Sequence, residues 1–264
     1  MRKLRITVLC ILAITLNSCL DMLDKDPISQ LSVDKLFETA DGADAAVVGC
    51  YSFLYGTGYY WQERWVFAFE GTDISGSAGG SANYQWTAGE NRWSDWWLTT
   101  YQAIGACNTT ITRLEKSTFD ENTKEKLLAE ARFLRAFYYY HALTYWGGVP
   151  LLKKEITSLD EVKYVKRCTR NELADFIITE AGDAAKILDK DPAIATRASK
   201  GAALMLQAKV YMWQEQWENA AKTCEEIIKL NKSFLNNMKI KKNIFFRSSS
   251  TLTIQNFRHE CYGI

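Results

Sequence analysis

The sequence predicts an all-α protein, and three observations point to that fold class. Apolar side chains recur at three- and four-residue steps through several long segments of the body. Capping residues stand at the starts of these segments, and Gly or Pro stands close to some of their ends. Only three Pro occur in 264 residues, and 47% of the residues are hydrophobic, which is enough to bury a core.

Two helices are expected in the first part of the body. The first runs from Thr39 to Tyr55 and is closed by Gly56. The second opens at Ser94 and continues to Leu114, with Asn108 on its apolar face. A buried amide needs partners, so we expect Asn108 to tie its helix to a neighbouring backbone, and contact with a ligand is the alternative.

Two more helices follow, each with a clear boundary signal. The third runs from about Asn122 through Tyr145 and ends at Trp146-Gly147-Gly148, where Pro150 prevents its continuation. The fourth begins at Thr169-Arg170-Asn171-Glu172, which has the spacing of a capping box, and continues to about Leu188.

The last expected pair of helices forms an αα-hairpin. Its helices span Ser199 to Met212 and Glu218 to Leu230, with the turn around 214–217. Ala208 and Tyr211 fit the tetratricopeptide pattern, although other positions of that motif depart from it. Small residues at such a crossing let helices approach closely, and hairpins of this kind stack because one pair cannot bury its own face.

The net charge of +1 conceals three different pieces. Residues 1–18 carry a charge of +3, residues 231–264 carry +5, and the body 19–230 carries −7. An acidic body argues against nucleic-acid binding, which depends on clustered Lys and Arg. The basic tail 231–264 has no helical period, and we expect it to be disordered or the product of an out-of-frame reading.

The first segment, 1–18, is interpreted as a lipoprotein signal peptide. Basic residues precede an apolar run, 6–16, that is too short to span a bilayer as a helix. Leu16-Asn17-Ser18-Cys19 then resembles a bacterial lipobox, in which Cys19 takes acyl chains such as palmitate and becomes the new N-terminus. An ordinary secretory signal without lipidation is the alternative.

The remaining cysteines and the motif content favour no metal, cofactor or catalytic centre. Cys50, Cys107, Cys168 and Cys224 are widely spaced, without C-x-x-C, and are expected to be buried free thiols on helix faces. The sequence contains no H-E-x-x-H, no G-x-S-x-G and no phosphate-binding loop. Acidic residues of the segment between the first two helices leave a glycosidase as the enzymatic alternative.

That segment, 56–91, is the candidate ligand site. It contains eight aromatic residues among Gly, Ser and Asn, and eight rings in so long a loop argue for function over disorder. Aromatic faces flanked by short polar side chains suit a sugar. The candidate contacts are Tyr60, Trp61, Asp73, Asn83, Tyr84 and Trp86. Packing of rings onto the helices is the alternative, and we favour it for Trp65, Phe67 and Phe69.

Four stretches of the body match one family pattern. They are Cys19-Leu20-Asp21 with Pro27, the run 130–140 (EARFLRAFYYY) leading to 146–151 (WGGVPL), the helix around Trp97 and Asn108, and 197–211 (RASKGAALMLQAKVY). Together these residues resemble the SusD/RagB family of outer-membrane nutrient-binding lipoproteins of Bacteroidota. Within the run, Arg132 and Arg135 are expected to pair with carboxylates or carbonyls and to stack on rings.

The resemblance implies a fold and a role. It implies a SusD-like scaffold of tetratricopeptide-like hairpins over 19–230, and a non-catalytic lipoprotein on the cell exterior, without a cofactor. Its implied partners are oligosaccharides, outer-membrane lipid through Cys19, and a SusC-like TonB-dependent transporter to which the glycan is delivered. A helical protein-interaction scaffold is the alternative function.

The resemblance also raises a question of length. Members of the family are about twice as long, so we interpret the chain as a truncated N-terminal half, with a frameshift or interrupted gene as the hypothesis for the tail. A natural short variant and a non-functional remnant remain alternatives.

Overall fold

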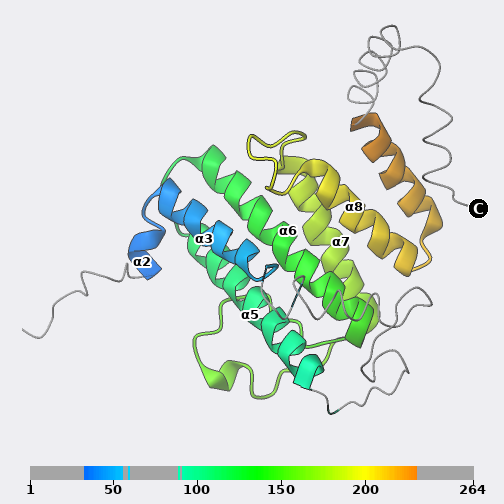
Figure 1. Ribbon diagram of the computed structural model, residues 1–264, viewed down its shortest axis with the longest axis horizontal. Coiled ribbons are helices and arrows are strands. Elements are labelled where there is room, and N and C mark those ends of the chain that lie inside the picture. The colour runs from blue at the N-terminus through cyan, green and yellow to red at the C-terminus, as the bar shows by residue number, and fades with distance from the viewer. Residues whose placement is uncertain (1–32, 56–58, 60–88, 90, 231–264) are drawn as a thin grey trace, which may run out of the picture.

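The computed structural model describes residues 33–55, 59, 89 and 91–230, and these residues are mostly helical (Figure 1). The elements are α2 (Val33–Leu36), α3 (Ala40–Ser52), α5 (Asn91–Leu114), α6 (Glu121–Trp146), the 3-10 helix η3 (Leu159–Glu161), α7 (Arg170–Ile187) and α8 (Lys200–Trp213). A further helix covers 217–230. Within the described ranges, β pairing is limited to an isolated bridge between Pro150 and Arg167. The predicted all-α fold class is confirmed.

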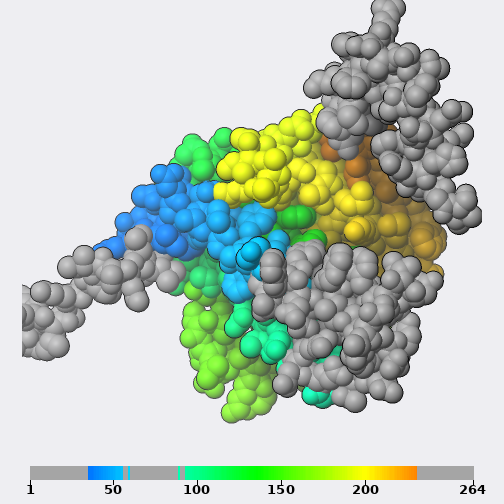
Figure 2. Space-filling view, in the orientation of Figure 1, coloured from blue at the N-terminus to red at the C-terminus, as the bar shows by residue number. Residues whose placement is uncertain are grey.

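α6 is the central helix of this arrangement. It packs against α5, α7 and α3, while α8 packs mainly on α7 (Figure 1). Its buried side chains include Leu134, Tyr138 and Leu143, and buried residues lie on several sides of the helix. A helix that is apolar on several sides must be covered from several sides. In the space-filling view only small areas of α6 reach the surface between α3 and the α7–α8 segments (Figure 2).

The helix starts largely follow the predicted caps. The Thr169 hydroxyl accepts from the Glu172 N–H at 3.2 Å, and the Glu172 carboxylate accepts from the Thr169 N–H at 2.7 Å, so the capping box is confirmed. Ser199 caps α8 by accepting from the Ala202 N–H at 3.2 Å. Thr39 caps α3 in the same way. These caps satisfy N–H groups that have no partner inside the helix.

The predicted start of α5 at Ser94 is wrong, because the helix already begins at Asn91. The extra turn contains Trp93, whose ring stacks on that of Trp96 with 6.3 Å between centroids. Ring packing therefore extends the helix beyond the polar residue that the sequence pattern favours as its cap. α3 likewise ends three residues before the predicted Tyr55.

The end of α6 falls where the sequence predicts it. Gly147 has φ of 72°, and a Cβ on Gly148 would lie 2.0 Å from the carbonyl oxygen of Cys168. The first position needs left-handed backbone and the second needs a close approach, so both require glycine. The Arg167 guanidinium donates to the carbonyls of Trp146 and Gly148 at 2.6 Å each and so holds the end of the helix.

The prediction for the thiols is correct for two of the four cysteines. Cys50 and Cys107 are buried on α3 and α5. Cys168 is half-buried in the connection before α7, where its thiol donates to the Val149 carbonyl at 3.0 Å, so the prediction of a helix position is wrong there. Cys224 lies on the helix 217–230 but is only half-buried. All four are free thiols.

Candidate functional site

The predicted ligand contacts lie outside the described residues, and the same holds for several other predicted features. The contacts are Tyr60, Trp61, Asp73, Asn83, Tyr84 and Trp86, and the other features are the signal peptide 1–18, Cys19 and the tail 231–264. The structure does describe where the aromatic segment joins the helices. We call this region the loop base and define it by its rings, which belong to Tyr59, Trp93, Trp96, Trp97, Tyr145 and Trp146.

Trp96 is the centre of the loop base. Its side chain is fully buried on α5, with the Tyr145 ring 4.1 Å and the Trp146 ring 5.2 Å away, both in edge contact. Trp93, one turn earlier on α5, stacks on the Trp96 ring. Edge and offset contacts of this kind are the favoured geometries of aromatic pairs. The start of α5 is thereby fixed to the end of α6.

Tyr59 fixes the beginning of the aromatic segment to the same place. Its ring is fully buried, in edge contact with Trp96, Tyr138 and His141 at centroid distances of 6.5, 5.4 and 5.5 Å. Tyr59 therefore packs on the helices. Packing of rings onto the helices was the alternative that the sequence left open for this segment. Both ends of the segment meet on one cluster of rings.

Part of the loop base remains accessible. Tyr145 is 43% exposed, and Trp97 is half-buried between Tyr101 and Trp146, at 4.8 and 5.3 Å. Exposed ring surface of this kind can stack on the CH face of a sugar. Tyr145 is not among the contacts predicted from the sequence. Its signal was its position five residues before Pro150, at the end of the predicted third helix.

Hydrogen bonds hold the connection after α6 against α5 and against α6 itself. The Tyr101 hydroxyl donates to the Pro150 carbonyl at 2.8 Å, and the Tyr139 hydroxyl both donates to and accepts from the Leu152 backbone, at 2.9 and 2.7 Å. Burial raises the pKa of both tyrosines, so their hydroxyls stay protonated and can donate. Asn108 donates to the same Leu152 carbonyl at 3.0 Å, which confirms its predicted tie to a neighbouring backbone.

Arg135 links the segment that follows α6 to α7. Its Nη1 donates to the Asn108 side-chain oxygen at 2.8 Å and to the Lys153 carbonyl at 2.9 Å, and its Nε donates to Glu180 at 3.0 Å. The guanidinium also lies 5.4 Å from the centre of the Phe176 ring. The predicted pairing with carboxylates, carbonyls and rings is confirmed. The second arginine of the run pairs nearer the surface, where Arg132 contacts Glu115 at 3.2 Å.

A second charged group joins α3, α6 and the start of α8. Arg197 donates to Glu130 at 2.7 Å and to Asp44 at 2.6 Å, and the Tyr51 hydroxyl accepts from the Ala198 N–H at 2.8 Å. Burial raises the pKa of Glu130 above its usual value, although Arg197 acts in the opposite direction. These contacts are ties between helices, and they lie away from the loop base.

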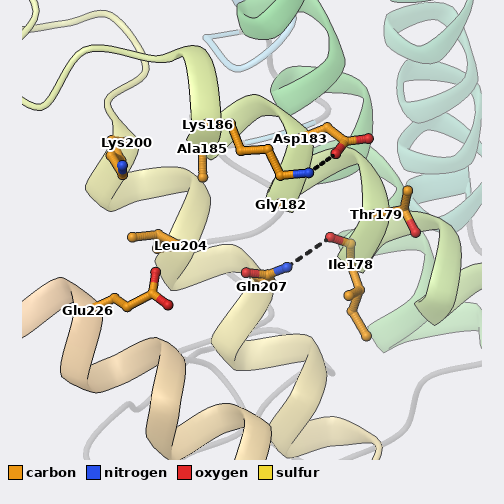
Figure 3. A pocket seen from close by; sticks show the side chains of 10 residues that line it. All are labelled: Ile178, Thr179, Gly182, Asp183, Ala185, Lys186, Lys200, Leu204, Gln207 and Glu226. Carbon is orange, nitrogen blue, oxygen red and sulfur yellow. Dashed lines mark hydrogen bonds and ion pairs between the residues drawn. The ribbon is translucent and has the colours of Figure 1, made fainter.

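Two open cavities lie beside α7. One, of about 460 Å³, is lined by residues that include Lys153, Phe176 and Asp175. The other, of about 400 Å³, lies between α7, α8 and the helix 217–230 (Figure 3). Its walls carry an Asp183–Lys186 ion pair at 2.7 Å and a hydrogen bond at 3.2 Å from the Gln207 amide to the Ile178 carbonyl. None of the described residues that line this second cavity is aromatic, so they offer no ring face on which a sugar could stack.

The described part of the chain lacks two features. No group of three or more His, Cys, Asp or Glu side chains in it could hold a metal ion. None of its helices combines the length and the apolar character needed to cross a membrane.

The fold and the loop base define a class of protein: a helical-hairpin protein whose aromatic rings gather where one long insertion leaves the helices. The chain belongs to the SusD-like family, whose sequence profile, described as "Starch-binding associating with outer membrane", matches residues 23–212.

Among curated relatives, SusD-like protein P2 of Formosa agariphila is 27% identical over 238 residues, which is 86% of this chain and 46% of the relative. A SusD-like protein of Bacteroides ovatus is 28% identical over 251 residues, covering 88% of this chain and 43% of the relative. The chain therefore spans about half the length of the curated relatives it matches.

Solved structures share the fold. A SusD-like carbohydrate binding protein from Bacteroides fragilis superposes with a TM-score of 0.65 at 25% identity, covering 74% of this chain and 41% of that one. A laminarin binding SusD-like protein superposes with a TM-score of 0.64 at 23% identity, covering 73% and 43%. The predicted SusD/RagB resemblance is confirmed.

Proposed function

We propose that this chain is part of a non-catalytic lipoprotein of the outer-membrane surface that binds nutrient oligosaccharides and delivers them to a TonB-dependent transporter. The observation that carries the proposal is membership of a family described as starch-binding and associated with the outer membrane. The relative from Bacteroides fragilis, described as a carbohydrate binding protein, supports the same ligand class.

The proposed glycan site is the aromatic segment together with the loop base beneath it. Half-buried Trp97 and exposed Tyr145 supply ring surface at the point where the segment leaves the helices. In the aromatic segment, Tyr60, Trp61, Tyr84 and Trp86 would add further rings, while Asp73 and Asn83 would bond to hydroxyl groups. Because both ends of the segment join one buried cluster, its rings would be presented from a rigid support.

A binding titration tests this proposal. The full chain, kept in detergent, is titrated with maltoheptaose, laminarihexaose and xylohexaose while Trp fluorescence is recorded. We expect saturable quenching by at least one glycan, and a loss of affinity of about tenfold or more, about 1.4 kcal/mol, in Trp86→Ala and Asn83→Ala.

The matched control for this titration is Trp217→Ala. Trp217 is 64% exposed on the helix 217–230, outside the loop base, so its removal should leave the affinity unchanged. Absence of quenching by all three glycans, or an equal loss in Trp217→Ala, would count against the proposed site.

The proposed membrane anchor is the acyl-modified Cys19, with the mature chain facing the cell exterior. In a bacterial host that processes lipoproteins, the full chain should incorporate labelled palmitate and sediment with the outer membrane. Cys19→Ser should abolish the label and release the chain, whereas Cys224→Ser should leave both unchanged. A labelled Cys19→Ser variant would refute the assignment.

A protein-interaction scaffold is the second candidate, because exposed apolar side chains lie on the last two described helices. Met205, Met212 and Trp217 are 43%, 42% and 64% exposed. If the aromatic segment docks a protein partner instead of a glycan, alanine substitution of Tyr84 and Trp86 should abolish co-purification of that partner. Co-purification that survives those substitutions argues against this candidate.

A further inference from the structure

Two buried thiols lie on either side of the aromatic segment. Cys50 is in the last turn of α3, before the segment, and Cys107 is in α5, after it. Their exposed fractions are 1% and 0%, and both belong to the same apolar core. α3 and α5 lie side by side (Figure 1). The two cysteines are therefore distant in sequence but neighbours in the fold.

The contacts of Cys50 place it against the face of α5 that carries Cys107. Its sulfur lies 3.4 Å from the Thr110 hydroxyl. Thr110 follows Cys107 by three residues, so the two side chains share a face of the helix. The Cys107 side chain is close enough to Cys50 for each thiol to influence the pKa of the other, and both belong to the same buried core.

The surroundings distinguish the two sulfurs chemically. The neighbouring Cys107 side chain lowers the pKa of Cys50, and the contact with Thr110 acts in the same direction. Burial raises the pKa of Cys107. Because the thiolate is the attacking species in thiol–disulfide exchange, Cys50 is the better nucleophile of the pair. The Cys50 carbonyl accepts from the Tyr138 hydroxyl at 2.7 Å, which fixes its backbone against α6.

We propose that Cys50 and Cys107 form a redox pair that closes to a disulfide between α3 and α5. The Cys50 thiolate attacks one sulfur of an oxidising disulfide, such as oxidised glutathione, and releases one thiol. The Cys107 thiol then gives up its proton, and its sulfur attacks the Cys50 sulfur and releases the second thiol. Two protein thiols are oxidised and one external disulfide is reduced, with both protons passing to the released thiols.

The burial of both sulfurs determines when this reaction can occur. An external disulfide reaches Cys50 when α3 separates from α5, or before α3 docks during folding. Once formed, the disulfide closes a covalent loop of the chain from residue 50 to residue 107, and this loop includes the whole aromatic segment. The two ends of the proposed glycan loop would then be held by a covalent bond in addition to the rings of the loop base.

The experiment compares the full chain refolded from denaturant in a glutathione redox buffer with the same chain kept in a phosphine reductant. We expect the oxidised chain to lose two titratable thiols and two hydrogen masses, and to yield a cross-linked peptide containing Cys50 and Cys107. We also expect the melting midpoint to rise by about 5–15 °C, because closing a long loop restricts the unfolded chain.

Matched variants separate the pair from the other cysteines. Cys168→Ser and Cys224→Ser should keep the cross-linked peptide and the rise in melting midpoint. Cys50→Ala and Cys107→Ala should lose both, while circular dichroism reports whether each variant is folded. A chain that keeps both thiols after oxidative refolding, or that links either cysteine to a different partner, would overturn the proposal.

Discussion

Arg135→Met should be among the most destabilising substitutions of a charged residue in α6. Arg135 is 4% exposed and donates to Glu180, Asn108 and the Lys153 carbonyl. Methionine fills similar space but leaves the Glu180 carboxylate, whose side chain is 15% exposed, without its cation. Breaking a buried pair in this way costs about 3–5 kcal/mol.

Arg132→Met is the matched control, three residues earlier on the same helix. Its pair with Glu115 has side-chain exposures of 33% and 53%, and exposed pairs contribute about 0–1 kcal/mol. Urea unfolding at neutral pH, followed by far-UV circular dichroism, gives the free energy of unfolding of each variant. The double variant Arg135→Met/Glu180→Met should recover part of the loss, because no charge is then left unpaired. Equal losses for Arg132→Met and Arg135→Met, or a loss below about 1 kcal/mol for Arg135→Met, would refute this reasoning.

Three further predictions concern stability. Gly148→Ala should lower the free energy of unfolding by more than about 1 kcal/mol, because the new Cβ would lie 2.0 Å from a carbonyl oxygen. Gly105→Ala is the contrasting variant in α5: a Cβ there meets nothing within 4 Å, so urea unfolding should show a gain of about 0.5–1 kcal/mol. Asn108→Ala should cost about 1–3 kcal/mol and make the connection after α6 more sensitive to limited proteolysis, because two partners lose their bonds. Burial raises the folded pKa of Glu130 above an unfolded value of about 4.3, so its contribution to stability is present below that pH and is lost as pH rises through the folded pKa. The melting midpoint of the native chain, relative to that of Glu130→Gln, should therefore fall as the pH rises above about 4.3, and an unchanged difference would contradict the assignment.

The features that could be predicted from the sequence depend mainly on local chemistry. The capping box of Thr169 and Glu172 and the glycine stop after α6 are determined within a few residues. The interhelical role of Arg135 was also predictable, because a cation among apolar residues needs a partner. Its particular partner, Glu180, depends on how α6 and α7 cross, which spacing alone does not specify.

The features that the sequence could not predict depend on tertiary contacts. Trp93 extends α5 because its ring packs on that of Trp96, and a local cap pattern contains no such information. Tyr59 belongs to a run of aromatic residues whose members look alike in sequence, yet the structure places it in the core. Half-exposed Cys168 was mispredicted because helical periodicity says little about a residue in a connection.

The order in which the helices pack also has a consequence for the folding rate. α5 packs on α6, α6 packs on α7 and α7 packs on α8, so most of the core forms from contacts between sequence neighbours. Low contact order of this kind favours rapid folding. α3 is the exception, because it must dock on α5 and α6 across the whole segment 56–90. We therefore expect α3 to dock last and its amides to exchange with solvent earliest among the long helices, with the others forming the early nucleus.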